Sequence, residues 1–137
     1  MSSFDEQTLA RLRTAALTAQ RRAHAPYSKF HVGAAMLTDH GRTITGCNVE
    51  NASYGLTICA ERNAIGRCVV EDAGKPIACV VVGPRPEVLT PCGACRQVLM
   101  EFNPDMEVHC FSSDGSHAVY TVRELLPHSF GADALET

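Results

Sequence analysis

Residues 59–62 read CAER and residues 91–96 read PCGACR, and these two stretches decide how the chain can be interpreted. Together they supply three thiols, those of Cys59, Cys92 and Cys95, at a spacing typical of metal-dependent hydrolases. Zinc in structural sites is normally held by four protein ligands, whereas catalytic zinc keeps one position for water. A set of three protein ligands therefore predicts a catalytic zinc site, with one Zn²⁺ per chain.

The second stretch predicts the start of a helix. Thr90 is the expected cap of a helix that begins at Pro91, because proline in the first helical position gives up only an amide hydrogen that has no helical partner. Cys92 and Cys95 would then lie on one side of the first turn. The helix dipole favours the thiolate form of both residues there.

The first stretch also predicts a helix, over residues 60–70, with Thr57 as its expected cap. Cys59 and Glu61 are two residues apart, so both can face one site only if Cys59 lies at the irregular start of the helix. Glu61 would then face the same site as the three thiols. Arg62 is expected to donate hydrogen bonds to the thiolate sulfurs and to offset their negative charge.

Other interpretations exist for each of these groups. A Cys-x-x-Cys pair alone also fits a redox dithiol or half of a structural zinc site. The sequence contains no second Cys-x-x-Cys pair, and its histidines do not form a His-x3–5-His pair. Glu61 alone would be interpreted as a carboxylate favoured by a helix dipole, and its position after Cys59 favours the catalytic role.

The chain resembles the short, zinc-dependent cytidine deaminases over nearly its whole length. Besides the cysteines, the family pattern is matched by PYSKF at 26–30, VGAA at 32–35, GCNVENASY at 46–54, ELLP at 124–127 and Phe130. The resemblance implies a homotetramer with sites at subunit interfaces. It also implies hydrolysis of cytidine and deoxycytidine to uridine, deoxyuridine and ammonia, as in pyrimidine salvage.

The resemblance implies roles for the residues near the reacting atoms. Glu61 would take a proton from the attacking water and deliver protons to N3 of the ring and to the departing amine. The amide of Ala60 would hold the pyrimidine O2. The carbonyl of Thr90 would lie near the leaving ammonia.

Further substrate contacts are implied in the same way. Asn48 and Glu50 would hold the ribose 3′-hydroxyl, and Phe30 would lie beside the nucleoside. Without the resemblance, Asn48 and Glu50 also fit the polar end of a strand, and Phe30 fits a core position. Tyr54 and Phe130 would reach the site of a neighbouring chain, with Phe130 stacking on the base.

Composition agrees with this function. A chain of 137 residues with 45% hydrophobic residues suits a single catalytic domain over residues 1–137. The formal net charge of −3 and the absence of a basic stripe favour a small nucleoside over nucleic acid as the binding partner. No stretch suits a membrane span or a signal peptide. Seven cysteines, three of them needed as thiolates, favour the reducing cytoplasm.

Hydrophobic periodicity places the elements. A capping box at Ser3 opens a helix that is expected to end at Pro26, and residues 77–82 form an apolar run typical of a strand buried on both faces. The remaining strands are expected at residues 31–38, 43–49, 106–111 and 118–122, with a short helix at 122–126. This order predicts an α/β fold, a three-layer α/β/α sandwich with a mixed five-stranded sheet.

Two alternative functions remain at the sequence level. The first is a related zinc deaminase that acts on another aminopyrimidine nucleoside or on a nucleotide. A carboxylate such as Glu50 at the sugar disfavours a phosphate there. The second is a non-catalytic interaction domain stabilised by zinc. That alternative would leave Glu61, beside an open coordination position of the zinc, without a function.

Overall fold

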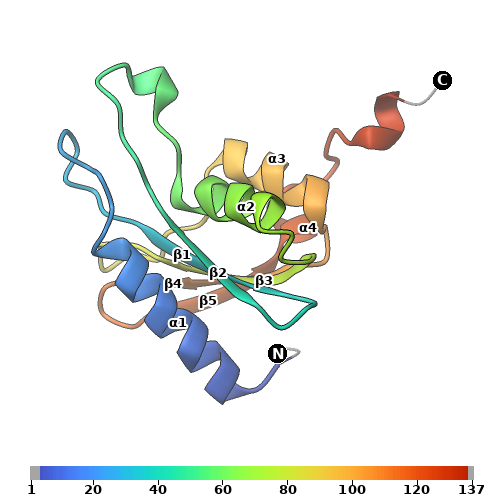
Figure 1. The fold of residues 1–137 in the computed structure, drawn as a ribbon, viewed down its shortest axis with the longest axis horizontal. Coiled ribbons are helices and arrows are strands. Elements are labelled where there is room, and N and C mark those ends of the chain that lie inside the picture. The colour runs from blue at the N-terminus through green and yellow to red at the C-terminus, as the bar shows by residue number, and fades with distance from the viewer. Residues whose placement is uncertain (1–3, 136–137) are drawn as a thin grey trace.

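The computed structural model describes residues 4–135, and its element order is the predicted one (Figure 1). The elements are α1 (Glu6–Gln20), β1 (Gly33–Thr38), β2 (Thr43–Cys47), α2 (Ala60–Val70), β3 (Pro76–Val82), α3 (Gly93–Phe102), β4 (Glu107–Phe111), β5 (His117–Thr121) and α4 (Val122–Leu125). Short 3-10 turns lie at Tyr54–Leu56 and Ala132–Leu135.

The strands form one sheet in the order β2-β1-β3-β4-β5. Only β3 and β4 run parallel, and the other neighbouring pairs are antiparallel. Helix α1 covers one face of the sheet, while α2 and α3 cover the other (Figure 1). The mixed five-stranded sheet between two helical layers confirms the predicted fold class.

The core lies on both faces of this sheet because side chains of a strand alternate between its faces. In β3, Cys79 and Val81 pack under α2 and α3, whereas Val80 and Val82 pack against α1. The strand is therefore buried on both sides, as predicted. Ile77 is the exception, with 38% of its surface exposed.

Helix α1 ends before the predicted position, at Gln20 rather than at Pro26. The backbone N–H of His24 donates to the backbone carbonyl of Asn48 (3.0 Å), and the backbone N–H of Glu50 donates to the backbone carbonyl of His24 (2.8 Å). These bonds to a distant segment replace the bonds that a longer helix would need. The predicted cap Ser3 lies outside the described residues, and Asp5 caps the helix by accepting from the Thr8 N–H at 2.8 Å.

Two glycines set how closely the helices approach the sheet. A Cβ atom on Gly33 would lie 2.0 Å from the carbonyl oxygen of Ala16 in α1. A Cβ atom on Gly46 would lie 2.4 Å from the carbonyl oxygen of Ala60 in α2. Only glycine, which has no Cβ atom, allows so close a contact. Gly46 therefore sets the distance between the start of α2 and the sheet. None of the helices within residues 4–135 combines the length and hydrophobicity that crossing a bilayer requires.

Candidate metal and active site

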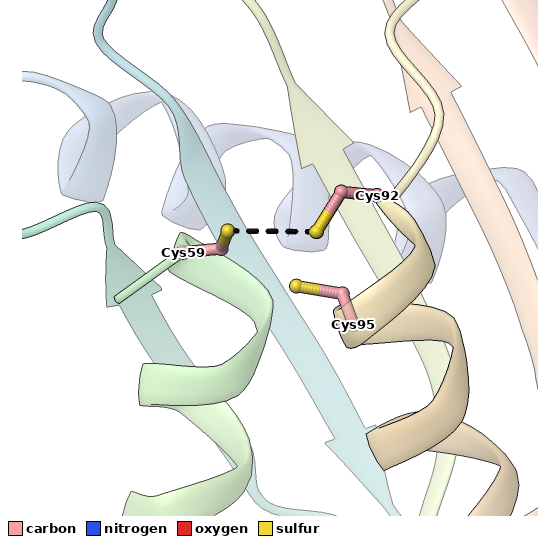
Figure 2. Close-up of side chains that lie close together, drawn as sticks. All are labelled: Cys59, Cys92 and Cys95. Atoms are coloured by element: carbon pink, nitrogen blue, oxygen red, sulfur yellow. Dashed lines mark hydrogen bonds between the residues drawn. The ribbon is translucent and has the colours of Figure 1, made fainter. Parts of the chain in front are cut away.

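Three cysteine sulfurs converge where α2 and α3 begin (Figure 2). Cys59 immediately precedes α2, Cys92 immediately precedes α3, and Cys95 lies in the first turn of α3. The sulfurs of Cys59 and Cys92 are 3.7 Å apart, and all three lie within 4.8 Å of one another. Tetrahedral zinc with Zn–S bonds of about 2.3 Å requires sulfurs about 3.8 Å apart. The three thiols therefore fit zinc.

Helix α2 spans Ala60–Val70, as predicted, but the start of α3 and the caps of both helices differ from the predicted ones. Helix α3 begins at Gly93 with Cys92 as its N-cap, rather than at Pro91 with Thr90 as its cap. The Thr90 hydroxyl instead accepts a hydrogen bond from Arg96 at 2.9 Å. Thr57 does not cap α2, because its hydroxyl accepts from the backbone N–H of Asn51 at 3.2 Å.

Cys59 itself is the N-cap of α2, with an extended backbone (φ −71°, ψ 159°). The irregular helix start that the sequence required is therefore present. This geometry brings the Cys59 sulfur beside Cys92 and Cys95 while Glu61, in the first turn of α2, turns into the interior.

Arg62 lies beside the sulfur cluster. Its guanidinium donates to the Cys59 sulfur at 3.7 Å and to the Thr57 carbonyl at 3.3 Å. Hydrogen bonding with Cys95, and then with Arg62 and Cys92, lowers the pKa of Cys59 to about 5. The same hydrogen bond raises the pKa of Cys95, so the cluster favours one thiolate, at Cys59, whose charge the guanidinium offsets.

Glu61 is buried, with 4% of its surface exposed. Burial raises the pKa of its carboxyl to about 7, and the nearby Cys59 charge adds to this effect while Arg62 opposes it. A carboxyl group with a pKa near neutrality can both accept and return a proton at physiological pH. The arrangement is therefore suited to acid–base chemistry next to the sulfur cluster.

A cavity of about 200 Å³ opens beside Glu61. Its walls combine apolar side chains with a few polar groups, as in small-molecule sites. The lining residues are Phe30, Val32, Asn48, Thr57, Cys59, Ala60, Glu61, Leu89, Thr90 and Cys92. The structure therefore gathers five of the predicted acid–base and substrate residues, Phe30, Asn48, Ala60, Glu61 and Thr90, around one space with two of the sulfurs.

Asn48 is buried and its side-chain amide bridges the backbone of the neighbouring segment. Its Nδ2 donates to the Phe30 carbonyl at 2.7 Å, and its Oδ1 accepts from the Val32 N–H at 2.9 Å. An asparagine amide can form up to four hydrogen bonds, so donor and acceptor capacity remains for a ligand. Asn48 also fixes the wall of the cavity to which Phe30 belongs.

Glu50 lies in an adjoining hollow rather than in the cavity itself. This hollow is lined by Tyr27, Ser28, Glu50, Tyr54 and Thr57, and Thr57 also lines the cavity. The Glu50 carboxylate accepts hydrogen bonds from the Ser28 hydroxyl and from the backbone N–H groups of Ser28 (3.2 Å) and Tyr27 (3.1 Å). The hydrogen bond from the Ser28 side chain lowers the pKa of Glu50, which keeps it ionised.

Tyr54 and Phe130 are not among the residues that line the cavity of their own chain. Tyr54 is 75% exposed on the 3-10 turn between β2 and α2. Phe130 is 61% exposed in the C-terminal segment, which extends away from the sheet beyond α4 (Figure 1). The Gln97 side chain donates to the Phe130 carbonyl at 2.9 Å and holds this segment beside α3.

Sequence reasoning gave no role to three residues near the cavity. Val32 and Leu89 line its apolar walls, and Arg96 binds the segment that contains Thr90. The position of Arg96 directly after Cys95 was visible in the sequence. Its partners were not, because they belong to other segments of the chain.

The chain is similar to known deaminases along most of its length. The family model described as the cytidine and deoxycytidylate deaminase zinc-binding region matches residues 6–111. Cytidine deaminase of Halalkalibacterium halodurans is 45% identical over 119 residues, which cover 86% of this chain and 90% of that protein. Cytidine deaminase of Mycobacterium tuberculosis is 44% identical over 126 residues, which cover 90% of each. The crystal structure of cytidine deaminase from Burkholderia pseudomallei superposes with a TM-score of 0.86 at 42% identity, covering 93% of this chain and all of that one.

Proposed function

Because the chain belongs to the cytidine and deoxycytidylate deaminase family, we propose that it hydrolyses cytidine and deoxycytidine to uridine and deoxyuridine with release of ammonia. It is a zinc-dependent hydrolase. The observation that carries the assignment is Glu61, a buried carboxyl with a pKa of about 7 beside three converging thiols and a small cavity.

Cys59, Cys92 and Cys95 hold the zinc ion in this proposal. When bound, the ion supplies Lewis acidity that makes water a nucleophile near neutral pH. Arg62 donates to the Cys59 sulfur and limits the negative charge that three thiolates concentrate at the site.

Glu61 carries the protons. It accepts a proton from water while the water oxygen forms a bond to C4 of the ring, and it delivers that proton to N3. It then takes the proton of the new C4 hydroxyl and gives it to the amine. The C4–N bond breaks, ammonia departs, and the C4 carbonyl of uridine forms. Burial supports this role because it raises the pKa of the carboxyl to about 7 and so lowers the cost of each proton exchange.

The remaining polar groups orient the nucleoside. The amide of Ala60 holds the pyrimidine O2 and the carbonyl of Thr90 receives the departing ammonia. Asn48 and Glu50 hold the ribose 3′-hydroxyl. Glu50 stays ionised because Ser28 binds it, and burying a phosphate beside this carboxylate is unfavourable. The proposal therefore favours nucleosides over nucleotides.

Tyr54 and Phe130 act on the site of a neighbouring chain in a homotetramer. The support is their large exposure, together with the position of Phe130 on a segment that extends away from its own chain's sheet. We place the enzyme in cytoplasmic pyrimidine salvage, as one catalytic domain. All seven cysteines are free thiols, which suits a reducing compartment.

The test compares the wild type with Glu61→Gln, which preserves shape but cannot accept a proton. An ultraviolet assay follows conversion of cytidine to uridine, and metal analysis counts zinc in both proteins. The wild type should turn over cytidine far faster than cytidine monophosphate. The variant should keep one zinc per chain and lose about 10²–10⁴-fold in kcat, the usual contribution of a general acid or base. Near-normal turnover by the zinc-loaded variant would remove Glu61 from its role.

A further inference from the structure

The side chain of Arg96 binds three acceptors on two segments that are distant in sequence. Its Nε donates to the Pro91 carbonyl at 2.7 Å, and its two terminal nitrogens donate to the Thr90 hydroxyl at 2.9 Å and to the Leu125 carbonyl at 2.8 Å. Every nitrogen of the guanidinium is therefore engaged. Bonds from a charged donor are stronger than neutral ones, so this network holds its acceptors firmly.

Two of these acceptors flank one peptide bond of the cavity wall. The Thr90 hydroxyl precedes the Thr90–Pro91 peptide bond and the Pro91 carbonyl follows it, while the carbonyl oxygen of the bond itself belongs to Thr90. Residues 88–91 lie outside the helices and strands, and Pro91 has no amide hydrogen with which to anchor this bond. A single guanidinium thus restrains the peptide unit from both sides.

The third acceptor fixes the guanidinium in turn. Leu125 is the last residue of α4, so Arg96 connects the loop before α3 to the end of α4. A planar guanidinium presents five N–H donors in a fixed fork, whereas a lysine ammonium is a single point with three rotating donors. Lysine at this position would keep the charge and lose the simultaneous contacts.

We infer that Arg96 is a positioning residue for the deamination step, which it serves by fixing the Thr90 carbonyl toward the departing amine. This inference rests on the proposed function. Arg96 is not among the residues that line the cavity, and its guanidinium is engaged by Thr90, Pro91 and Leu125. Its influence is exerted where the C4–N bond breaks, because the amine becomes a better hydrogen-bond donor there than in the bound substrate.

The test is Arg96→Lys, with Arg42→Lys as the matched control. Arg42 also binds a backbone carbonyl and a side chain, those of Glu71, but on the surface away from the cavity. Measurements are zinc content, kcat and KM for cytidine, and the dissociation constant of uridine by calorimetry. Uridine has no amine at C4, so its binding does not report on the Thr90 carbonyl.

Arg96→Lys should keep one zinc per chain and the wild-type affinity for uridine. Its kcat should fall by about 10²-fold, the effect of misplacing a group by about 1 Å, with little change in KM. Arg42→Lys should match the wild type in all four measurements. Wild-type kcat in Arg96→Lys would overturn the inference. The inference would also be overturned if Arg96→Lys lost zinc in proportion to its loss of activity, or if its affinity for uridine fell as much as its kcat.

A second variant covers the case in which Arg96→Lys does not fold. Thr90→Val removes one acceptor and leaves the bonds of Arg96 to Pro91 and Leu125 intact. Its kcat should fall by about tenfold with uridine affinity unchanged, as for loss of one charge-assisted hydrogen bond. Unaltered kcat in Thr90→Val would also overturn the inference. A wild type that does not deaminate cytidine would refute the proposed function together with this inference. An active wild type whose kcat is equalled by either variant would refute the inference alone.

Discussion

Gly46→Ala should impair the site from a position outside the cavity. The added methyl group would lie 2.4 Å from the Ala60 carbonyl oxygen and 2.6 Å from the Ala64 nitrogen, both in the backbone of α2. Ordinary contacts of a Cβ atom begin at 3.4 Å, so the start of α2 must retreat from the sheet by about 1 Å. Neither atom is the end of a flexible side chain that could rotate away.

The retreat has two consequences of predictable size. Overpacking a close contact costs about 1–3 kcal/mol in the free energy of unfolding. The same movement carries Cys59 and Glu61, at the start of α2, away from Cys92 and Cys95, at the start of α3. Misplacement by about 1 Å costs up to about 10²-fold in rate, so we expect kcat to fall by that order.

Urea unfolding, metal analysis and the cytidine assay measure these effects. The matched control is Gly66→Ala, a glycine within α2 itself, where an added Cβ has no heavy atom within 4 Å. Alanine is the better helix former there and should stabilise the protein by about 0.5–1 kcal/mol with full activity. If Gly46→Ala is as stable and as active as Gly66→Ala, the close approach of α2 to the sheet does not set the geometry of the site.

Three further predictions concern the metal, the buried carboxyl and the C-terminal segment. Cys95→Ala should lose zinc while the buried Cys68→Ala keeps it, and a Cys95→Ala protein with a full zinc equivalent by metal analysis would exclude the proposed ligand set. In the metal-free protein, the pKa of Glu61 is about 7 in the native state and 4.5 in the unfolded chain. Between these two pH values the native state keeps a proton that the unfolded chain releases. The free energy of unfolding should therefore fall as pH rises from about 4.5 to about 7. Glu61→Gln should therefore be more stable than the wild type by about 3 kcal/mol at pH 8 and equal to it at pH 4, and equal differences in urea unfolding at both pH values would contradict the burial argument. Phe130→Ala should lose base stacking worth about 1–3 kcal/mol, and oligomers formed by refolding it with Glu61→Gln should be more active than the two separately refolded variants together. Merely additive activity in mixed oligomers verified by mass analysis would show that Phe130 does not act in trans.

The sequence predicted the elements of the site because their geometry is local. Cys92 and Cys95 are three residues apart at a helix start, and Cys59 and Glu61 can share a site only if Cys59 lies before the helix. Each of these two requirements follows from the helical period, whereas the expectation that the two stretches meet at one site came from the resemblance to cytidine deaminases. The alternating burial of residues in β3 is equally local, because it depends only on the pleat of a strand.

The parts that the sequence could not predict depend on contacts between distant segments. Helix α1 was expected to continue to Pro26, but the bonds of His24 to residues 48–50 end it at Gln20. Thr90 was expected to cap α3, but its hydroxyl accepts from Arg96 instead. The bond of Arg96 to Leu125 spans a separation along the chain that no local pattern reveals.

The two helices that carry the site begin at cysteines whose side chains form no capping hydrogen bond, since Cys59 and Cys92 are directed toward each other. The ion they are expected to bind therefore organises both helix ends at once. Chelation should loosen the first turns of α2 and α3 together, because ligand binding and local folding are linked. Amide hydrogen exchange in those two turns would then report metal occupancy directly, in the absence of any substrate.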